Sequence, residues 1–160
     1  MSVSLVAATA TARLFSIFLL MSNPASAASP GSQEVATTDM EIHYSVTSTE
    51  ALRAYPAGSV ERTMHGGVPR SSSQRHVMIA VLDRTTKQPI ADAIVTARVA
   101  ELAQTGEEKK LEPMVIAGAP TYGNYFTMKG RGPFHIAVTV ARPKHADKVH
   151  ASFDYTAWDR

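Results

Sequence analysis

Sulfur and imidazole side chains are the groups in this sequence best suited to bind a ligand. After its first 27 residues the chain has no cysteine, five methionines and six histidines. The methionines are Met40, Met64, Met78, Met114 and Met128, and the histidines are His43, His65, His76, His135, His145 and His150. Thioether sulfur with imidazole nitrogen suits Cu(I), whereas imidazole with carboxylate oxygen suits Fe(II), Cu(II) or Zn(II). The composition is compatible with a metal site but does not choose the metal.

Two short motifs place a methionine near a histidine. Met64 and His65 lie in the glycine-flanked loop TMHGGVP, and His76 and Met78 open the apolar run HVMIAVLD. Residues two apart on a strand share a face, so His76 and Met78 point the same way. We expect the two pairs to converge on a metal ion. The alternative is packing, because Met78 and Met128 at strand positions are more often core filler and Met64 is equally suited to dock as a hydrophobic plug.

Several functional classes are disfavoured. The sequence has no HExxH zinc motif, no GxSxG nucleophile elbow and no glycine-rich phosphate loop between a strand and a helix. We therefore expect a protein that is not an enzyme. Its 16 Lys and Arg residues nearly balance 14 Asp and Glu residues, whereas a nucleic-acid-binding surface needs clustered positive charge. We expect no nucleic-acid partner.

The first 27 residues resemble a secretory signal peptide. Arg13 precedes the apolar run LFSIFLLM, and Pro24 leads into the small-residue cleavage pattern Ala25-Ser26-Ala27. The run is far shorter than the roughly 20 apolar residues that a membrane-spanning helix needs. We therefore expect cleavage near Ala27, a periplasmic protein and no membrane insertion.

The rest of the chain predicts one all-β domain. Residues 28–39 are small and polar and are expected to be disordered, and residues 40–160 are expected to form a single β-sandwich. The segment 134–141, FHIAVTVA, alternates apolar and polar side chains with the period of a half-buried strand. Seven such segments with turn signals between them predict an immunoglobulin-like sandwich of about seven strands. The expected strands are 40–46, 76–83, 91–102, 109–117, 121–128, 134–141 and 149–156. The stretch between Thr49 and Arg75 shows no sustained hydrophobic period of a helix or a strand, and its role stays open.

One segment carries a family resemblance. Residues 113–143, PMVIAGAPTYGNYFTMKGRGPFHIAVTVARP, resemble the C-terminal half of the bacterial periplasmic iron-transport-associated proteins. The shared pattern is a Pro-Met, a Pro-x-Tyr-Gly, a methionine, a Gly-x-Gly turn, an aromatic strand and a proline. Here it consists of Pro113, Met114, Pro120, Tyr122, Gly123, Met128, Gly130, Gly132, Phe134 and Pro143. The resemblance implies a small exported β-sandwich linked to iron uptake and able to bind copper, with Met114 as a metal ligand.

This chain departs from that family at one expected ligand, because Thr121 stands where the family has a histidine before Tyr-Gly. A site would then be rebuilt around Met114, His65 and His76, with Met64 or Met78 as a further ligand. The predicted function is periplasmic handling of copper or iron without catalysis, with transfer to a membrane transporter or another periplasmic protein. The alternative is a non-metal β-sandwich module that binds another exported or membrane protein, and a homodimer is compatible with either function.

Overall fold

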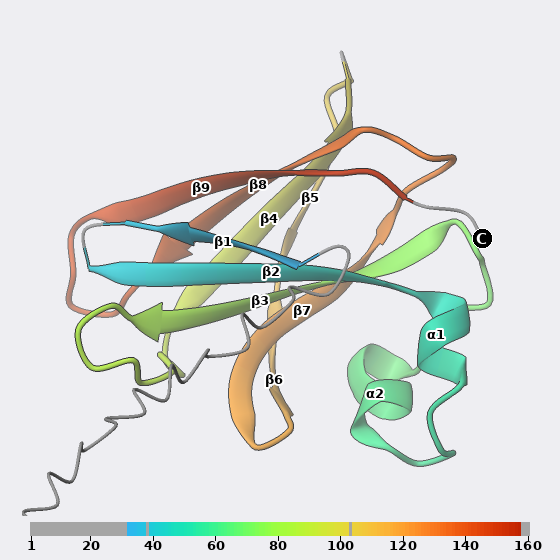
Figure 1. The fold of residues 1–160 in the computed structure, drawn as a ribbon, viewed down its shortest axis with the longest axis horizontal. Coiled ribbons are helices and arrows are strands. Elements are labelled where there is room, and N and C mark those ends of the chain that lie inside the picture. Colours follow the sequence, from blue (N-terminus) through green and yellow to red (C-terminus); the bar gives the residue numbers. More distant parts are fainter. Residues whose placement is uncertain (1–31, 38, 103, 158–160) are drawn as a thin grey trace, which may run out of the picture.

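Two stacked antiparallel β-sheets form the framework of the protein (Figure 1). The computed structural model describes residues 32–37, 39–102 and 104–157. In spatial order, the five-stranded sheet contains β1 (Ser32–Ala36), β2 (Met40–Ser48), β3 (Gln74–Asp83), β7 (Ala119–Thr127) and β6 (Glu112–Ile116). The four-stranded sheet contains β5 (Glu107–Lys110), β4 (Ile94–Glu101), β8 (Phe134–Ala141) and β9 (Lys148–Tyr155). The predicted all-β sandwich is confirmed.

The core lies between the two sheets. Every second residue of β8 from Phe134 to Val140 is buried, and so is every second residue of β3 from Val77 to Val81. Successive side chains of a strand point to opposite faces of the sheet, so this alternation gives each sheet one apolar face. Burying the two apolar faces against each other removes them from water and supplies the main stabilising free energy of the fold.

The strand register decides which side chains share the outer face of the five-stranded sheet, away from the core. His76 on β3 lies opposite Tyr125 on β7, and Met78 lies opposite Gly123. On the next strand, β6, Glu112 pairs with Gly123. Residues directly opposite each other in an antiparallel pair point to the same side. These five residues therefore belong to the outer face.

Residues 49–73, here called the helical segment, connect β2 to β3. They contain α1 (Thr49–Arg53), α2 (Val60–Thr63) and the 3₁₀ turn η1 (Met64–Gly66). Helix α1 contacts β2 and β3, and α2 contacts the edge strand β6. Figure 1 shows both helices beside the five-stranded sheet. The helical segment therefore lies against the sheet from β2 across to β6.

Local contacts hold the helical segment in place. The Ser48 side chain accepts a hydrogen bond of 3.2 Å from the N–H of Ala51, which caps the start of α1. Leu52, a residue of that helix, is buried. The Arg53 guanidinium donates to the carbonyl of Pro69, which ties the beginning of the segment to its end.

Two local predictions are wrong. Residues 32–36, inside the stretch 28–39 expected to be disordered, form β1 and pair with β2. The single strand expected over 109–117 is divided at Leu111 between β5 and β6, which belong to different sheets. Leu111 is buried and its N–H donates to the carbonyl of Val95 at 2.8 Å, so the chain enters the core where it changes sheet. The described residues therefore form nine strands.

The predicted signal peptide, residues 1–27, lies outside the described residues, and its cleavage stays a prediction. The single-domain boundary at residues 40–160 stays a prediction as well. Within the described ranges, no helix combines the length and the apolar character needed to cross a bilayer.

Candidate metal centre

His76 is the buried centre of the site. Only 2% of its surface is exposed, although it points to the outer face of the sheet. Its Nε2 atom is buried and has no hydrogen-bond partner in the structure. Burial and, to a smaller extent, the nearby His65 together lower the pKa of His76 from 6.5 to about 3. The ring is therefore neutral near pH 7, which is the form that binds metal ions.

Gly123 brings Met114 and His76 together. A Cβ atom placed on Gly123 would lie 2.6 Å from His76 Nε2 and 2.7 Å from Met114 Cε. Both side chains therefore fill the space that any larger residue at position 123 would occupy. Because Gly123 on β7 has no side chain, the Met114 thioether from β6 and the His76 imidazole from β3 can meet over this position.

His65 reaches the same place from the helical segment. Its ring centroid lies 5.2 Å from that of His76, and only 5% of its side chain is exposed. The residue adopts a left-handed backbone conformation, with φ 54° and ψ 34°, directly before Gly66 and Gly67. A left-handed conformation is uncommon for a residue with a side chain and is worth examining for a functional reason. Here it places the His65 imidazole over the sheet.

Glu112 and Tyr125 complete the surroundings of the two histidines. Glu112 Oε2 accepts a 2.7 Å hydrogen bond from His65 Nδ1. The ring of Tyr125 lies 5.0 Å from that of His76 and 6.1 Å from that of His65, measured between centroids. Burial raises the pKa of Tyr125, so its hydroxyl remains protonated at neutral pH. The site is thus lined by one carboxylate, two imidazoles, one phenol and one thioether.

Buried polar atoms without a partner are concentrated here. Native proteins satisfy nearly all buried polar groups, and each exception calls for an explanation such as a bound ion or water. Seven side-chain atoms of this kind occur among the described residues. Five of them belong to the outer face of the five-stranded sheet or to the turn above it: Ser45 Oγ, His65 Nε2, His76 Nε2, Thr121 Oγ1 and Tyr125 Oη. The two imidazole nitrogens are the strongest metal ligands among them.

The structure brings together three of the five residues proposed as ligands from the sequence. His65, His76 and Met114 converge as described above. Met78 lies on the same face, opposite Gly123, and borders a hollow of about 160 Å³ shared with Ser45. Met64 is half-buried at the start of η1. As metal ligands, all five residues stay predictions.

Sequence reasoning missed Glu112, Gly123 and Tyr125. Gly123 belonged to the family pattern, but nothing in the sequence showed that its missing side chain makes room for two others. Glu112 looks like any acidic residue of an exposed strand. Its role depends on a contact with a residue 47 positions away, which the sequence does not display.

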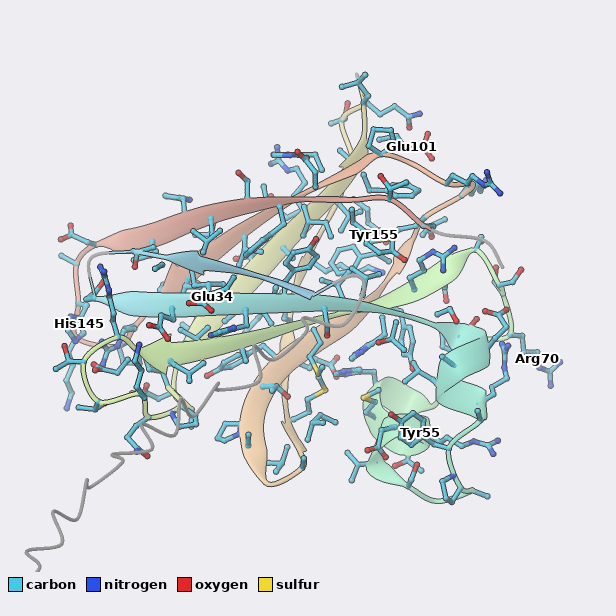
Figure 2. The ribbon with its side chains drawn as sticks, viewed as in Figure 1. Glu34, Tyr55, Arg70, Glu101, His145 and Tyr155 are labelled. Carbon is cyan, nitrogen blue, oxygen red and sulfur yellow. The ribbon has the colours of Figure 1, made fainter. Side chains whose placement is uncertain are left out.

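A second group of metal-compatible side chains lies farther along the same outer face. One ligand atom each from Glu34, Glu41 and His43 lies within 4.8 Å of the others. Figure 2 shows Glu34 away from Tyr55 of the helical segment. His43 lies 3.7 Å from Glu34 and 4.0 Å from Glu41, and Lys87 pairs with Glu41. These contacts already account for the cluster without a metal.

Comparison with known proteins finds the same fold in several solved structures. No protein family model matches the sequence, and no curated protein matches it significantly. A DUF4426 family protein from Pseudomonas aeruginosa PAO1 shares the fold with a TM-score of 0.60 and 20% identity, covering 81% of this chain and 97% of that one. FetP from uropathogenic Escherichia coli strain F11, expressed in the periplasm, has a TM-score of 0.57, 17% identity and coverage of 81% and 95%. Copper-reconstituted P19 from Campylobacter jejuni has a TM-score of 0.56, 16% identity and coverage of 81% and 98%.

These comparisons confirm the predicted resemblance at the level of the fold. The shared architecture extends over most of the chain, whereas the sequence resemblance was confined to residues 113–143. Identities of 16% to 20% establish the fold and nothing finer. The assignment of a function must therefore come from the site of this chain.

Proposed function

We propose that this protein is a periplasmic metal-binding protein that carries copper as its cargo and has no catalytic role. Its ligands are the Nε2 atoms of His65 and His76 and the sulfur of Met114. The observation that carries the proposal is the pair of buried imidazole nitrogens without partners, next to a thioether that packs into the same space.

The donor set favours a soft metal ion over iron. Imidazole and thioether together suit Cu(I), whereas Fe(II) sites combine imidazole with carboxylate oxygen. The carboxylate nearest to the site, that of Glu112, already accepts a hydrogen bond from His65. The copper-bound structures of FetP and P19 support the same choice, since copper is bound within a similar fold.

The position of the site suits uptake and release rather than permanent storage. His76 and Met114 come from two strands of one sheet, β3 and β6, but His65 comes from a short 3₁₀ turn and is followed by two glycines. Movement of that turn would remove one of three ligands and leave the other two in place. A membrane transporter or another periplasmic protein is the expected recipient of the ion.

The first prediction is a Cu(I) affinity that depends on three residues. The protein is isolated from the periplasm, its mass is checked for cleavage after Ala27, and it is titrated with Cu(I) under anaerobic conditions against a competing chelator. His65→Ala, His76→Ala and Met114→Leu each remove one ligand. Loss of a contact that supports a ligand lowers metal affinity by about 10- to 100-fold. Loss of a ligand itself should lower the Cu(I) affinity by more than that. Met114→Leu keeps the apolar volume, so its free energy of unfolding should fall by less than about 1.5 kcal/mol.

His150→Ala is the matched control, because it removes a histidine from the opposite outer face of the sandwich. Its Cu(I) affinity should equal that of the wild type. Equal affinity in all variants, or no binding above the competitor in the wild type, would contradict the proposed site. The protein would then be better described as an interaction module without a metal.

A further inference from the structure

The contact between Glu112 and His65 joins two distant parts of the chain at the edge of the site. Glu112 lies on the edge strand β6, and His65 lies in the turn η1 of the helical segment. The Glu112 side chain is 61% exposed, whereas that of His65 is 5% exposed. The Glu112 carboxylate thus lies at the solvent-exposed edge of the site, and the His65 imidazole that it contacts lies inside the site.

The chemistry of this hydrogen bond defines the state of the His65 ring. A carboxylate only accepts hydrogen bonds, so the proton of the contact belongs to His65 Nδ1. In a neutral imidazole with its proton on Nδ1, the lone pair is on Nε2. That Nε2 atom is buried and has no partner, next to the ring of His76. The hydrogen bond therefore leaves the lone pair of His65 Nε2 free to bind a metal ion.

The backbone of His65 also needs an external contact to hold it. The residue has a left-handed φ of 54°, and Gly66 and Gly67 follow with φ values of 79° and 100°. Glycine adopts such conformations freely, so the chain after His65 has little intrinsic preference for one position. The 2.7 Å contact with Glu112 connects this turn to the regular sheet.

We propose that Glu112 is the positioning residue of the metal centre: it fixes the Nδ1-protonated tautomer of His65 and holds the ring so that Nε2 faces His76 and Met114. This inference rests on the proposed function, since it concerns the same site. A carboxylate behind a metal-binding histidine orients the ring and raises its basicity, and its removal costs about 10- to 100-fold in metal affinity.

The test separates ring orientation from metal binding. First, nitrogen-detected NMR of the histidine rings is recorded on the metal-free wild type, Glu112→Ala and Glu112→Gln. The wild type should show His65 protonated on Nδ1. Glu112→Ala should populate the Nε2-protonated form, and Glu112→Gln should keep the wild-type form because the glutamine carbonyl still accepts the hydrogen bond.

Second, Cu(I) affinities are measured for the same proteins. Glu112→Ala should lose about 10- to 100-fold in affinity, and Glu112→Gln should retain most of it. Glu108→Ala is the matched control, since it removes a similarly exposed glutamate that pairs with Arg98 away from the site. It should leave the affinity unchanged. In a His65→Ala background, Glu112→Ala should have no further effect, because the residue it positions is gone.

Three results would overturn the inference: an unchanged His65 tautomer in Glu112→Ala, an equal loss of affinity in Glu108→Ala, or a loss that persists without His65. A wild type that binds no Cu(I) would instead overturn the proposed function, together with the role of Glu112 in affinity. The ring tautomer of His65 would then still decide whether Glu112 orients it.

Discussion

The two outer faces of the sandwich both carry histidines but treat them differently. On the four-stranded sheet, His135 pairs with Asp154 at 3.0 Å and His150 contacts the Thr139 hydroxyl at 3.1 Å. Both residues are exposed. On the five-stranded sheet, His76 is buried and its Nε2 has no partner. The residue type is the same on both faces, so the difference in burial arises from the part of the chain that covers each face.

The helical segment produces this difference. It lies against β2, β3 and β6 and brings His65 over His76. Covering a polar face excludes water from it, and a buried polar atom without a partner costs about 1 to 3 kcal/mol. A fold tolerates such a cost where a ligand can offset it. Burial, more than the number of histidines, therefore distinguishes the candidate site from the rest of the surface.

The largest effect that we expect from this comparison concerns pH and stability. The pKa of His76 is about 3 in the folded protein and 6.5 in its ordinary environment. The unfolded chain therefore binds a proton at a pH where the folded protein does not. The stability associated with neutral His76 is complete above pH 6.5 and is lost as the pH falls toward 3. Between pH 7 and 4.5 the free energy of unfolding should fall by about 2 to 3 kcal/mol from this residue alone.

Chemical denaturation of the metal-free protein at a series of pH values measures this effect. His76→Gln should remove this part of the pH dependence, since glutamine does not titrate. His150→Gln is the control and should keep it, because His150 is exposed on the other face. The same pH dependence in His76→Gln and the wild type would show that His76 is hydrated in solution.

The next effect concerns the close packing at Gly123. A Cβ at this position would approach His76 Nε2 and Met114 Cε within 2.7 Å, a distance that forces both side chains to move. Gly123→Ala should therefore lower the free energy of unfolding by about 1 to 3 kcal/mol, as overpacking usually does, and should weaken Cu(I) binding. Thermal or chemical denaturation and the copper titration measure the two effects.

Combining Gly123→Ala with Met114→Ala gives the internal control. If the two positions compete for one space, the double variant should lose less stability than the sum of the two single losses. Additive losses, or a Gly123→Ala variant as stable as the wild type, would mean that Met114 and His76 do not meet at this glycine.

The sequence predicted the fold because its signal is local. The alternation in FHIAVTVA, residues 134–141, is visible within eight residues and became β8. The division at Leu111 could not be predicted, since residues on both sides of it form strands and only the tertiary structure assigns them to different sheets. Strand β1 was missed because its residues, SQEVA, are mostly polar and gain their structure from pairing with β2.

The site was predictable only in its ligand types. His65 and His76 were proposed because imidazole and nearby methionine sulfur suit a soft metal ion, and Met114 was proposed because the family resemblance implied it. The contributions of Glu112 and Gly123 depend on register, which pairs these two residues across β6 and β7. Period-two patterns define the faces of a strand but leave its partner unspecified. A glycine that makes room and a carboxylate that orients a ring therefore emerge only from the assembled sheet.

The smallest effect that we expect is at His150, the exposed histidine on the opposite face of the sandwich. His150→Ala removes an exposed side chain that makes one contact with Thr139. Surface substitutions of this kind usually change the free energy of unfolding by less than about 0.5 kcal/mol. Chemical denaturation should show this small change, and the Cu(I) affinity should stay at the wild-type value. A large loss of affinity in this variant would move the site to the four-stranded sheet and make covering by the helical segment irrelevant. If His150→Ala keeps the wild-type Cu(I) affinity and His76→Ala loses it, the metal is bound by the buried histidine without a partner and not by the exposed one.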